Sequence, residues 1–197
     1  MNFRIFPIFS SALVLVTSVF LAGCNNSSTS EPVKTTSAVV SIEAITAGAK
    51  GFTVGSPMSA RTVYVFFDAQ CPHCSALWYA AKPLKSQAKF VWIPVGILNA
   101  ASTSQGATIL AASDPVAAME THEASMMSKG GGISATADAD AQKDAIRKNT
   151  ELMTSFGFAS IPSIVAKHAQ TGELVKQEGA MPTAALASFL GLQVPAQ

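Results

Sequence analysis

The chain has 197 residues, of which 49% are hydrophobic and 13% charged, and its formal net charge is +1. This length suits one domain with a substantial apolar core and is too short for two large domains. The charge is close to zero and no basic stripe is present, so nucleic-acid binding has no electrostatic support.

The first 23 residues are typical of an export signal. Arg4 provides a positive start, residues 5–22 are mostly apolar, and small residues precede Cys24. Residues 21–24 read LAGC and resemble a bacterial lipoprotein signal. The resemblance implies cleavage before Cys24, acylation of its sulfur and anchoring in the bacterial cell envelope, facing the periplasm. An ordinary secretory signal and an uncleaved anchor helix are the alternatives, and Pro7 weakens the second.

Residues 24–37 are rich in Ser, Thr and Asn, which predicts a flexible tether ahead of a domain that spans residues 38–197. Residues 39–45 alternate between apolar and polar side chains and predict a first strand. A short extended segment at 52–54 follows, between glycine-containing turns.

The central feature is the stretch 66–74, which reads FFDAQCPHC. Residues 62–67 are β-branched and aromatic, as in a buried strand, whereas residues 75–89 have the composition of a helix that Pro83 should kink or break. Cys71 and Cys74 therefore lie where a strand passes into a helix N-terminus. The free N–H groups and the helix dipole at that point favour a thiolate, and they lower a cysteine pKa from about 8.5 to roughly 3.5–7.5. The pattern indicates a dithiol redox centre.

The cysteine count supports this interpretation. The chain has three cysteines, so a lipid on Cys24 leaves Cys71 and Cys74 as a matched pair. A cysteine pair with this spacing can also form half of a zinc site, but no further cysteine pair exists. The other ligands would have to be carboxylates or the histidines of the chain, which are His73, His122 and His168. We interpret His122, in the insert, and His168, on a strand, as ordinary polar residues.

The rest of the chain predicts an α/β domain. Residues 89–97 predict a central strand. A helical crossover joins it to the strand at 62–67, so the two strands should be parallel. A helical insert of two or three helices is expected at about 103–154, interrupted by the glycines at 130–132. We expect four of its apolar residues to pack internally: Leu110, Met119, Met126 and Met127.

The C-terminal third predicts a strand, a hairpin and a helix. Pro162 stands at the head of a strand, and Thr171-Gly172 marks a hairpin turn between two β runs. Residues 182–190 predict a final helix with proline in its first turn, capped by Gly191.

Residues 62–190 resemble the thioredoxin superfamily, and within it the bacterial Dsb thiol:disulfide interchange proteins. The tetrapeptide 71–74 (CPHC) matches the DsbA type, whereas Asp68, Trp78 and the segment 106–115 are similar to DsbG- and DsbC-type catalytic domains. The resemblance implies a thioredoxin fold with the helical insert placed before the proline strand. It also implies a cis peptide bond at Pro162, beside the dithiol.

The same resemblance implies the chemistry. Cys71 attacks a protein disulfide, Cys74 resolves the mixed disulfide, and the oxidised site is a Cys71–Cys74 disulfide. His73 stabilises the thiolate, and Pro72 restricts the turn. No metal or organic cofactor is needed. The partners are protein thiols or disulfides and a membrane redox partner.

The chain departs from this pattern at three points. Ile161, whose backbone would pair with an extended substrate, stands where DsbG and DsbC have Thr. Val65 stands where many relatives have a buried acid, so water or Asp68 would have to accept the proton of Cys74. The equal alternative for Asp68 is that it caps the turn. The segment before residue 62 has no room for a dimerisation domain, so we expect a monomer. The net direction, as oxidase, reductase or isomerase, stays open.

The alternative function is a soft-metal binding or delivery module for copper. Its ligands would be the dithiol, His73 and the insert methionines Met119, Met126 and Met127. A methionine site that includes His122 is a second form of this alternative.

Overall fold

The strand β2 (Thr62–Asp68) forms the centre of the fold, and six of its seven residues are buried. It pairs in parallel with β3 (Lys89–Val95), from Thr62 opposite Lys89 to Asp68 opposite Val95. On its other side it pairs antiparallel with β4 (Ser163–Lys167). A strand covered on both faces needs the continuous apolar run that the sequence has here. Both central strands and their parallel direction are confirmed.

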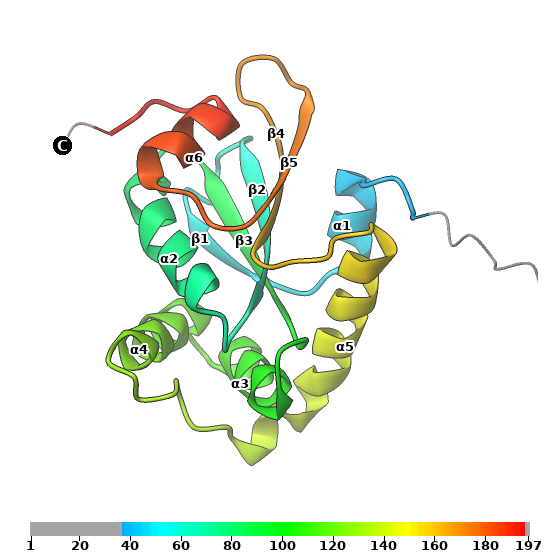
Figure 1. Ribbon diagram of the computed structural model, residues 1–197, viewed down its shortest axis with the longest axis vertical. Coiled ribbons are helices and arrows are strands. Elements are labelled where there is room, and N and C mark those ends of the chain that lie inside the picture. The colour runs from blue at the N-terminus through cyan, green and yellow to red at the C-terminus, as the bar shows by residue number, and fades with distance from the viewer. Residues whose placement is uncertain (1–36, 196–197) are drawn as a thin grey trace, which may run out of the picture. The chain divides into compact units, whose positions relative to one another are not determined.

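The computed structural model describes residues 37–195 and adds one edge strand on each side of these three (Figure 1). β1 (Phe52–Gly55) pairs antiparallel with β3, and β5 (Leu174–Glu178) pairs antiparallel with β4, so the strand order is β1-β3-β2-β4-β5. The predicted hairpin is thus confirmed as β4–β5. Its turn contains Gly172 with φ +74°, in the left-handed region that glycine adopts without steric cost.

Helices cover both faces of the sheet. Figure 1 shows α2 (Pro72–Ala81) and α6 (Thr183–Leu190) on one side, and α1 (Ile42–Gly48) and α5 (Asp140–Ser155) on the other. As predicted, α2 ends before Pro83 and continues as a 3-10 turn, Lys82–Leu84. Gly191 caps α6 in the left-handed conformation.

An aromatic cluster attaches α2 to the sheet. The rings of Trp78 on α2 and Trp92 on β3 lie 5.0 Å apart, and Phe67 contacts Trp92 at 5.6 Å, both edge to face. Such pairs contribute about 0.5–1.5 kcal/mol each beyond their burial. The cluster therefore fixes the axis of α2 and, with it, the position of Cys71 at its start.

Three helices stand between β3 and β4, as the expected insert requires. They are α3 (Ala100–Ala111), α4 (Pro115–Met127) and α5, and the chain turns between α4 and α5 through Gly131 and Gly132, which have φ +81° and +90°. The insert packs on α2 through α4 and returns to β4 through a cis peptide bond between Ile161 and Pro162. The cis bond implied by the resemblance is confirmed.

Three expectations are wrong. Residues 39–45 do not form a strand: Ser41 caps the helix α1 by accepting a hydrogen bond from the Ala44 N–H at 3.2 Å, and Ile45 is the residue that α1 buries. Met127 is 65% exposed instead of packing internally, because it is the last residue of α4. His168 lies just after β4, in the hairpin turn, and not on a strand.

Residues 1–36 hold the expected signal segment, Cys24 and nearly all of the expected tether, and they lie outside the described residues. Within residues 37–195, no helix combines the length and the apolar character needed to cross a bilayer.

Candidate active site

The two thiols lie at the junction of β2 and α2. Cys71 is the N-cap of α2 in an extended conformation, and Pro72 begins the helix, where a missing N–H costs nothing. The Cys71 carbonyl accepts the N–H groups of Cys74 at 3.0 Å and Ser75 at 3.2 Å. Both cysteines are free thiols; Cys71 is 5% exposed and Cys74 is fully buried. The location at the helix start is confirmed, and Cys71 is the more accessible thiol by a small margin.

The surroundings of Cys71 favour its thiolate. Its pKa falls to about 6, chiefly because the Cys74 thiol donates a hydrogen bond to it. Burial opposes this shift, and the backbone N–H groups of Cys74 and His73 and the charge of His73 support it. The sulfur is therefore largely ionised at neutral pH, which is the nucleophilic form.

The surroundings of Cys74 have the opposite effect. Burial raises the pKa of Cys74 far above its usual value, and the hydrogen bond to Cys71 and the charge of the Cys71 thiolate add to the shift. Cys74 therefore keeps its proton while Cys71 loses its own. This unequal pair is suited to an attacking thiolate and a second thiol held in reserve.

The cis-proline segment lies against Cys71. The carbonyl of Ile161 is 3.8 Å from the Cys71 Sγ, which donates to it when protonated. The Ile161 side chain is 9% exposed and packs in the core next to Pro162. The backbone at Ile161 thus contacts the reactive sulfur, although its side chain offers no hydrogen bond.

Asp68 is fully buried at the end of β2. One carboxylate oxygen accepts the N–H of Gln70 at 2.9 Å, and the other accepts those of Ile97 at 2.8 Å and Leu98 at 3.1 Å. Asp68 thereby joins the turn before Cys71 to the segment that follows β3. These contacts support the capping interpretation over proton transfer, because both oxygens already serve backbone amides.

His122 joins the insert to the same turn. Its ring is fully buried, with Nε2 2.7 Å from the Ala69 carbonyl and Nδ1 accepting the Ile133 N–H at 3.2 Å. Because Nδ1 accepts a hydrogen bond, the ring proton lies on Nε2, and burial lowers the pKa of His122. Both ring nitrogens are engaged, and His122 has the structural role expected from the sequence.

Sequence reasoning missed Glu123. It lies on the face of α4 that meets α2, is 1% exposed, and its Oε2 has no hydrogen-bond partner among the described residues. Burial raises the pKa of Glu123 to about 7, and the nearby Ser75 hydroxyl offsets part of that shift. The signal was its spacing from Met119: residues four apart share a helix face, and Met119 was expected to be buried.

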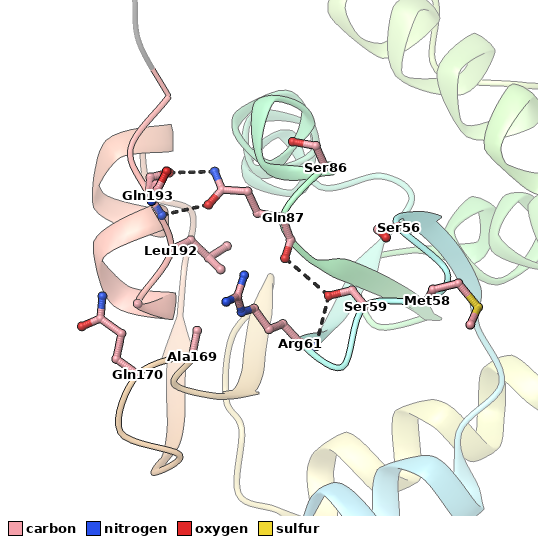
Figure 2. A pocket seen from close by; sticks show the side chains of 11 residues that line it. Ser56, Met58, Ser59, Arg61, Ser86, Gln87, Ala169, Gln170, Leu192 and Gln193 are labelled. Atoms are coloured by element: carbon pink, nitrogen blue, oxygen red, sulfur yellow. Dashed lines mark hydrogen bonds between the residues drawn. The ribbon is translucent and has the colours of Figure 1, made fainter.

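A hollow in the surface lies away from the dithiol (Figure 2). It has a volume of about 550 Å³ and is lined by Arg61 and by Gln87, whose side chain pairs with the backbone of Gln193. Arg61 precedes β2 whereas Cys71 follows it, so this hollow lies at the other end of the strand. Within the described part of the chain, no three His, Cys, Asp or Glu residues are grouped so that they could hold a metal ion.

A five-stranded sheet with a dithiol at a helix start, facing a cis-proline, defines the thioredoxin class of folds. Two solved structures share it. A thioredoxin-like oxidoreductase from Silicibacter pomeroyi superposes with a TM-score of 0.57 at 20% identity, over 77% of this chain and 96% of that one. A periplasmic thioredoxin-like protein from Salmonella enterica superposes with a TM-score of 0.55 at 18% identity, over 72% and 88%. The predicted fold class is confirmed.

The sequence is similar to that of one Dsb protein. The chain is 36% identical to the thiol:disulfide interchange protein DsbG of Pseudomonas aeruginosa over 137 residues, which are 66% of this chain and 51% of that protein. The chain thus spans about half the length of this curated relative. No family model matches the chain. The structural comparison shows a thioredoxin-like fold, and the sequence comparison shows similarity to a Dsb protein.

Proposed function

We propose that the chain is a thiol:disulfide oxidoreductase that exchanges disulfides with protein substrates through Cys71 and Cys74. The observation that carries the proposal is the inequality of the two thiols: the pKa of Cys71 is lowered to about 6, whereas that of Cys74 is raised. The similarity to a thiol:disulfide interchange protein supports it.

The reaction uses the two thiols in turn. The Cys71 thiolate attacks one sulfur of a substrate disulfide, and the other sulfur leaves as a thiolate. Cys74 then gives up its proton and attacks the Cys71 sulfur of the mixed disulfide. The second substrate sulfur leaves, and a Cys71–Cys74 disulfide remains. The reverse sequence oxidises a client dithiol.

Five neighbouring residues have supporting roles in the proposal. His73 and the helix start stabilise the thiolate, and Pro72 fixes the turn. The segment Ile161-Pro162 presents its backbone beside Cys71, where an extended substrate chain would add a short strand. Asp68 holds the turn in place through its three amide contacts.

The cellular setting belongs to the proposal as well. The lipoprotein-like run at 21–24 supports anchoring through Cys24 in the bacterial envelope, facing the periplasm, and one structural relative is described as periplasmic. We further propose a monomer that exchanges electrons with a membrane redox partner. Sedimentation of the purified protein tests the monomer, and mass spectrometry of the mature N-terminus tests the lipid.

The copper alternative receives no support from the described residues. His122 has both ring nitrogens engaged, and Met119 is fully buried whereas Met127 is at the surface, so these side chains do not converge on one ion. We therefore do not propose it.

The test is equilibration of the protein in glutathione redox buffers, with the oxidised fraction read by thiol alkylation. We expect a reversible Cys71–Cys74 disulfide. A reduction potential of about −120 mV would mean that the protein donates disulfides, whereas a potential of about −270 mV would mean that it acts as a reductant.

Three variants complete this test. Cys71→Ser should abolish exchange, and Cys74→Ser should accumulate a mixed disulfide with substrate. The matched control is Cys24→Ser, which should keep full exchange because Cys24 lies outside the pair. Absence of any Cys71–Cys74 disulfide would overturn the proposed function.

A further inference from the structure

Two buried polar atoms in the described part of the chain have no hydrogen-bond partner, and they belong to neighbouring helices: the Ser75 Oγ on α2 and the Glu123 Oε2 on α4. Both residues are almost fully enclosed, and the Ser75 hydroxyl is close enough to Glu123 to lower the pKa of its carboxyl. An ionised carboxylate buried without a partner is strongly unfavourable. A buried acid of this kind is therefore expected to change its protonation state when nearby charge changes.

Contacts on both sides hold Glu123 in this place. Glu120, one turn earlier on α4, forms an ion pair with Lys82 and accepts a hydrogen bond from the Trp78 indole at 3.5 Å. His122, the preceding residue, is fixed to the Ala69 carbonyl at 2.7 Å. Because these contacts set the rotation of α4, Glu123 cannot turn toward water without breaking them.

The charge that changes nearby is that of Cys71. Ser75 follows Cys71 by four residues and donates its N–H to the Cys71 carbonyl, so the two residues lie on the same side of α2 one turn apart. The Cys71 thiolate is one of the causes that raise the pKa of Glu123. Such coupling is reciprocal: an ionised Glu123 disfavours the Cys71 thiolate to the same extent.

Other ionisable groups near α4 do not replace this pair. The helix α2 and the turn after it carry Cys71, His73, Cys74, Tyr79 and Lys82, whereas α3 and β1, which also pack on α4, have no ionisable side chain. Glu120 raises and Lys82 lowers the pKa of Glu123, and each affects it less than Cys71 does. Asp68 acts on Cys74 and on His122, and both ring nitrogens of His122 are engaged.

We propose that Glu123 is the redox-linked proton carrier of the dithiol site, protonated while Cys71 is a thiolate and deprotonated once the Cys71–Cys74 disulfide has formed. This inference rests on the proposed function. The position of the carboxyl, buried beside Ser75 on the Cys71 side of α2, carries it.

The protons and electrons balance. The reduced site holds a Cys71 thiolate, a Cys74 thiol and a Glu123 carboxylic acid. Two electrons pass to a substrate disulfide, the Cys71–Cys74 bond forms, and the substrate S–S bond breaks. The proton of Cys74 and the proton of Glu123 go to the two substrate thiolates, which leave as thiols. The site retains one negative charge throughout, on sulfur before the reaction and on the Glu123 carboxylate after it.

The test is the number of protons taken up when the oxidised full-length protein is reduced. Near pH 6.5 we expect clearly more than one proton per two electrons in the wild type and about one in Glu123→Gln, because in the variant only Cys74 gains a proton. Against a reference dithiol, which takes up two protons on reduction, the equilibrium constant of Glu123→Gln should therefore change about tenfold per pH unit, which equals about 30 mV, and that of the wild type should change less. The matched control is Glu151→Gln, an exposed acid on α5 that has no contact with α4 or the dithiol and should retain the wild-type count. An unchanged count in Glu123→Gln would overturn the inference.

A second measurement needs no variant and stays decisive if Glu123→Gln does not fold. The reduced-minus-oxidised infrared difference spectrum of the wild type at pH 6.5 should show a carboxylic acid carbonyl band that is positive for the reduced form. Absence of that band overturns the inference, although the disulfide itself still forms. Failure of the wild type to form any Cys71–Cys74 disulfide overturns the proposed function, and the inference with it.

Discussion

Two buried acids flank the dithiol, one at the end of β2 and one on α4, and their surroundings differ completely. Asp68 and Glu123 are 0% and 1% exposed. Asp68 accepts three backbone N–H groups, whereas the Oε2 of Glu123 has no partner among the described residues. Burial alone therefore does not define the role of an acid. Its hydrogen bonds decide whether it holds the fold together or is free to exchange a proton.

The largest effect should come from the acid with partners. Asp68→Ala leaves three backbone amides, those of Gln70, Ile97 and Leu98, without their acceptor. Since hydrogen bonds to a charged group contribute about 1.5–3 kcal/mol each and are not additive, we expect the free energy of unfolding to fall by about 4 kcal/mol. Urea denaturation at pH 7 measures it.

Asp68→Asn is the matched control. It keeps one acceptor oxygen, so its free energy of unfolding should fall less than that of Asp68→Ala. A loss below about 1 kcal/mol in Asp68→Ala would contradict the structural role of this acid.

The next effect is the pH dependence that Glu123 imposes on stability. The pKa of Glu123 is about 7 in the folded protein against an ordinary 4.5, so the folded state binds the extra proton between these values. The contribution of this proton to the free energy of unfolding is fully present below pH 4.5 and is lost as the pH rises through about 7. The shift corresponds to a loss of about 3 kcal/mol.

Glu123→Gln should remove this decline, so that the difference between variant and wild type grows in favour of the variant from pH 5 to pH 8. Denaturation of the reduced proteins across that range measures the difference. Parallel stability curves for the two proteins would show that Glu123 ionises as an exposed carboxyl does.

The smallest expected effect concerns the second thiol, Cys74, and not the two acids. The largest cause of the lowered pKa of Cys71 is the hydrogen bond from Cys74, and neither Asp68 nor Glu123 contributes to the lowering. Cys74→Ala should move the midpoint of the alkylation rate of Cys71 upward from about 6 by about one pH unit. The measurement uses the Cys24→Ser background, in which Cys71 is the only reactive thiol. A midpoint that stays near 6 would assign the shift to the helix start and His73 instead.

The sequence by itself determined the dithiol site to a large extent, because its signals are local. A β-branched run ending at Asp68, a helix-forming segment after Pro72 and the spacing of Cys71 and Cys74 are all read within a few turns of chain. The same holds for the break of α2 before Pro83 and for the hairpin turn at Gly172. The cis bond before Pro162 came from the family resemblance.

Only the tertiary structure decided what joins distant segments. The apparent alternation at 39–45 gave way to α1, where the Ser41 cap and the burial of Ile45 favour a helix. The role of Asp68 depends on amides of residues 97 and 98, which β3 brings to the same edge of the sheet. The burial of Glu123 depends on which side of α4 meets α2. Polar and apolar residues are mixed around that helix, so apart from the four-residue spacing to Met119 its own sequence does not mark the buried face, and contacts with other elements select it.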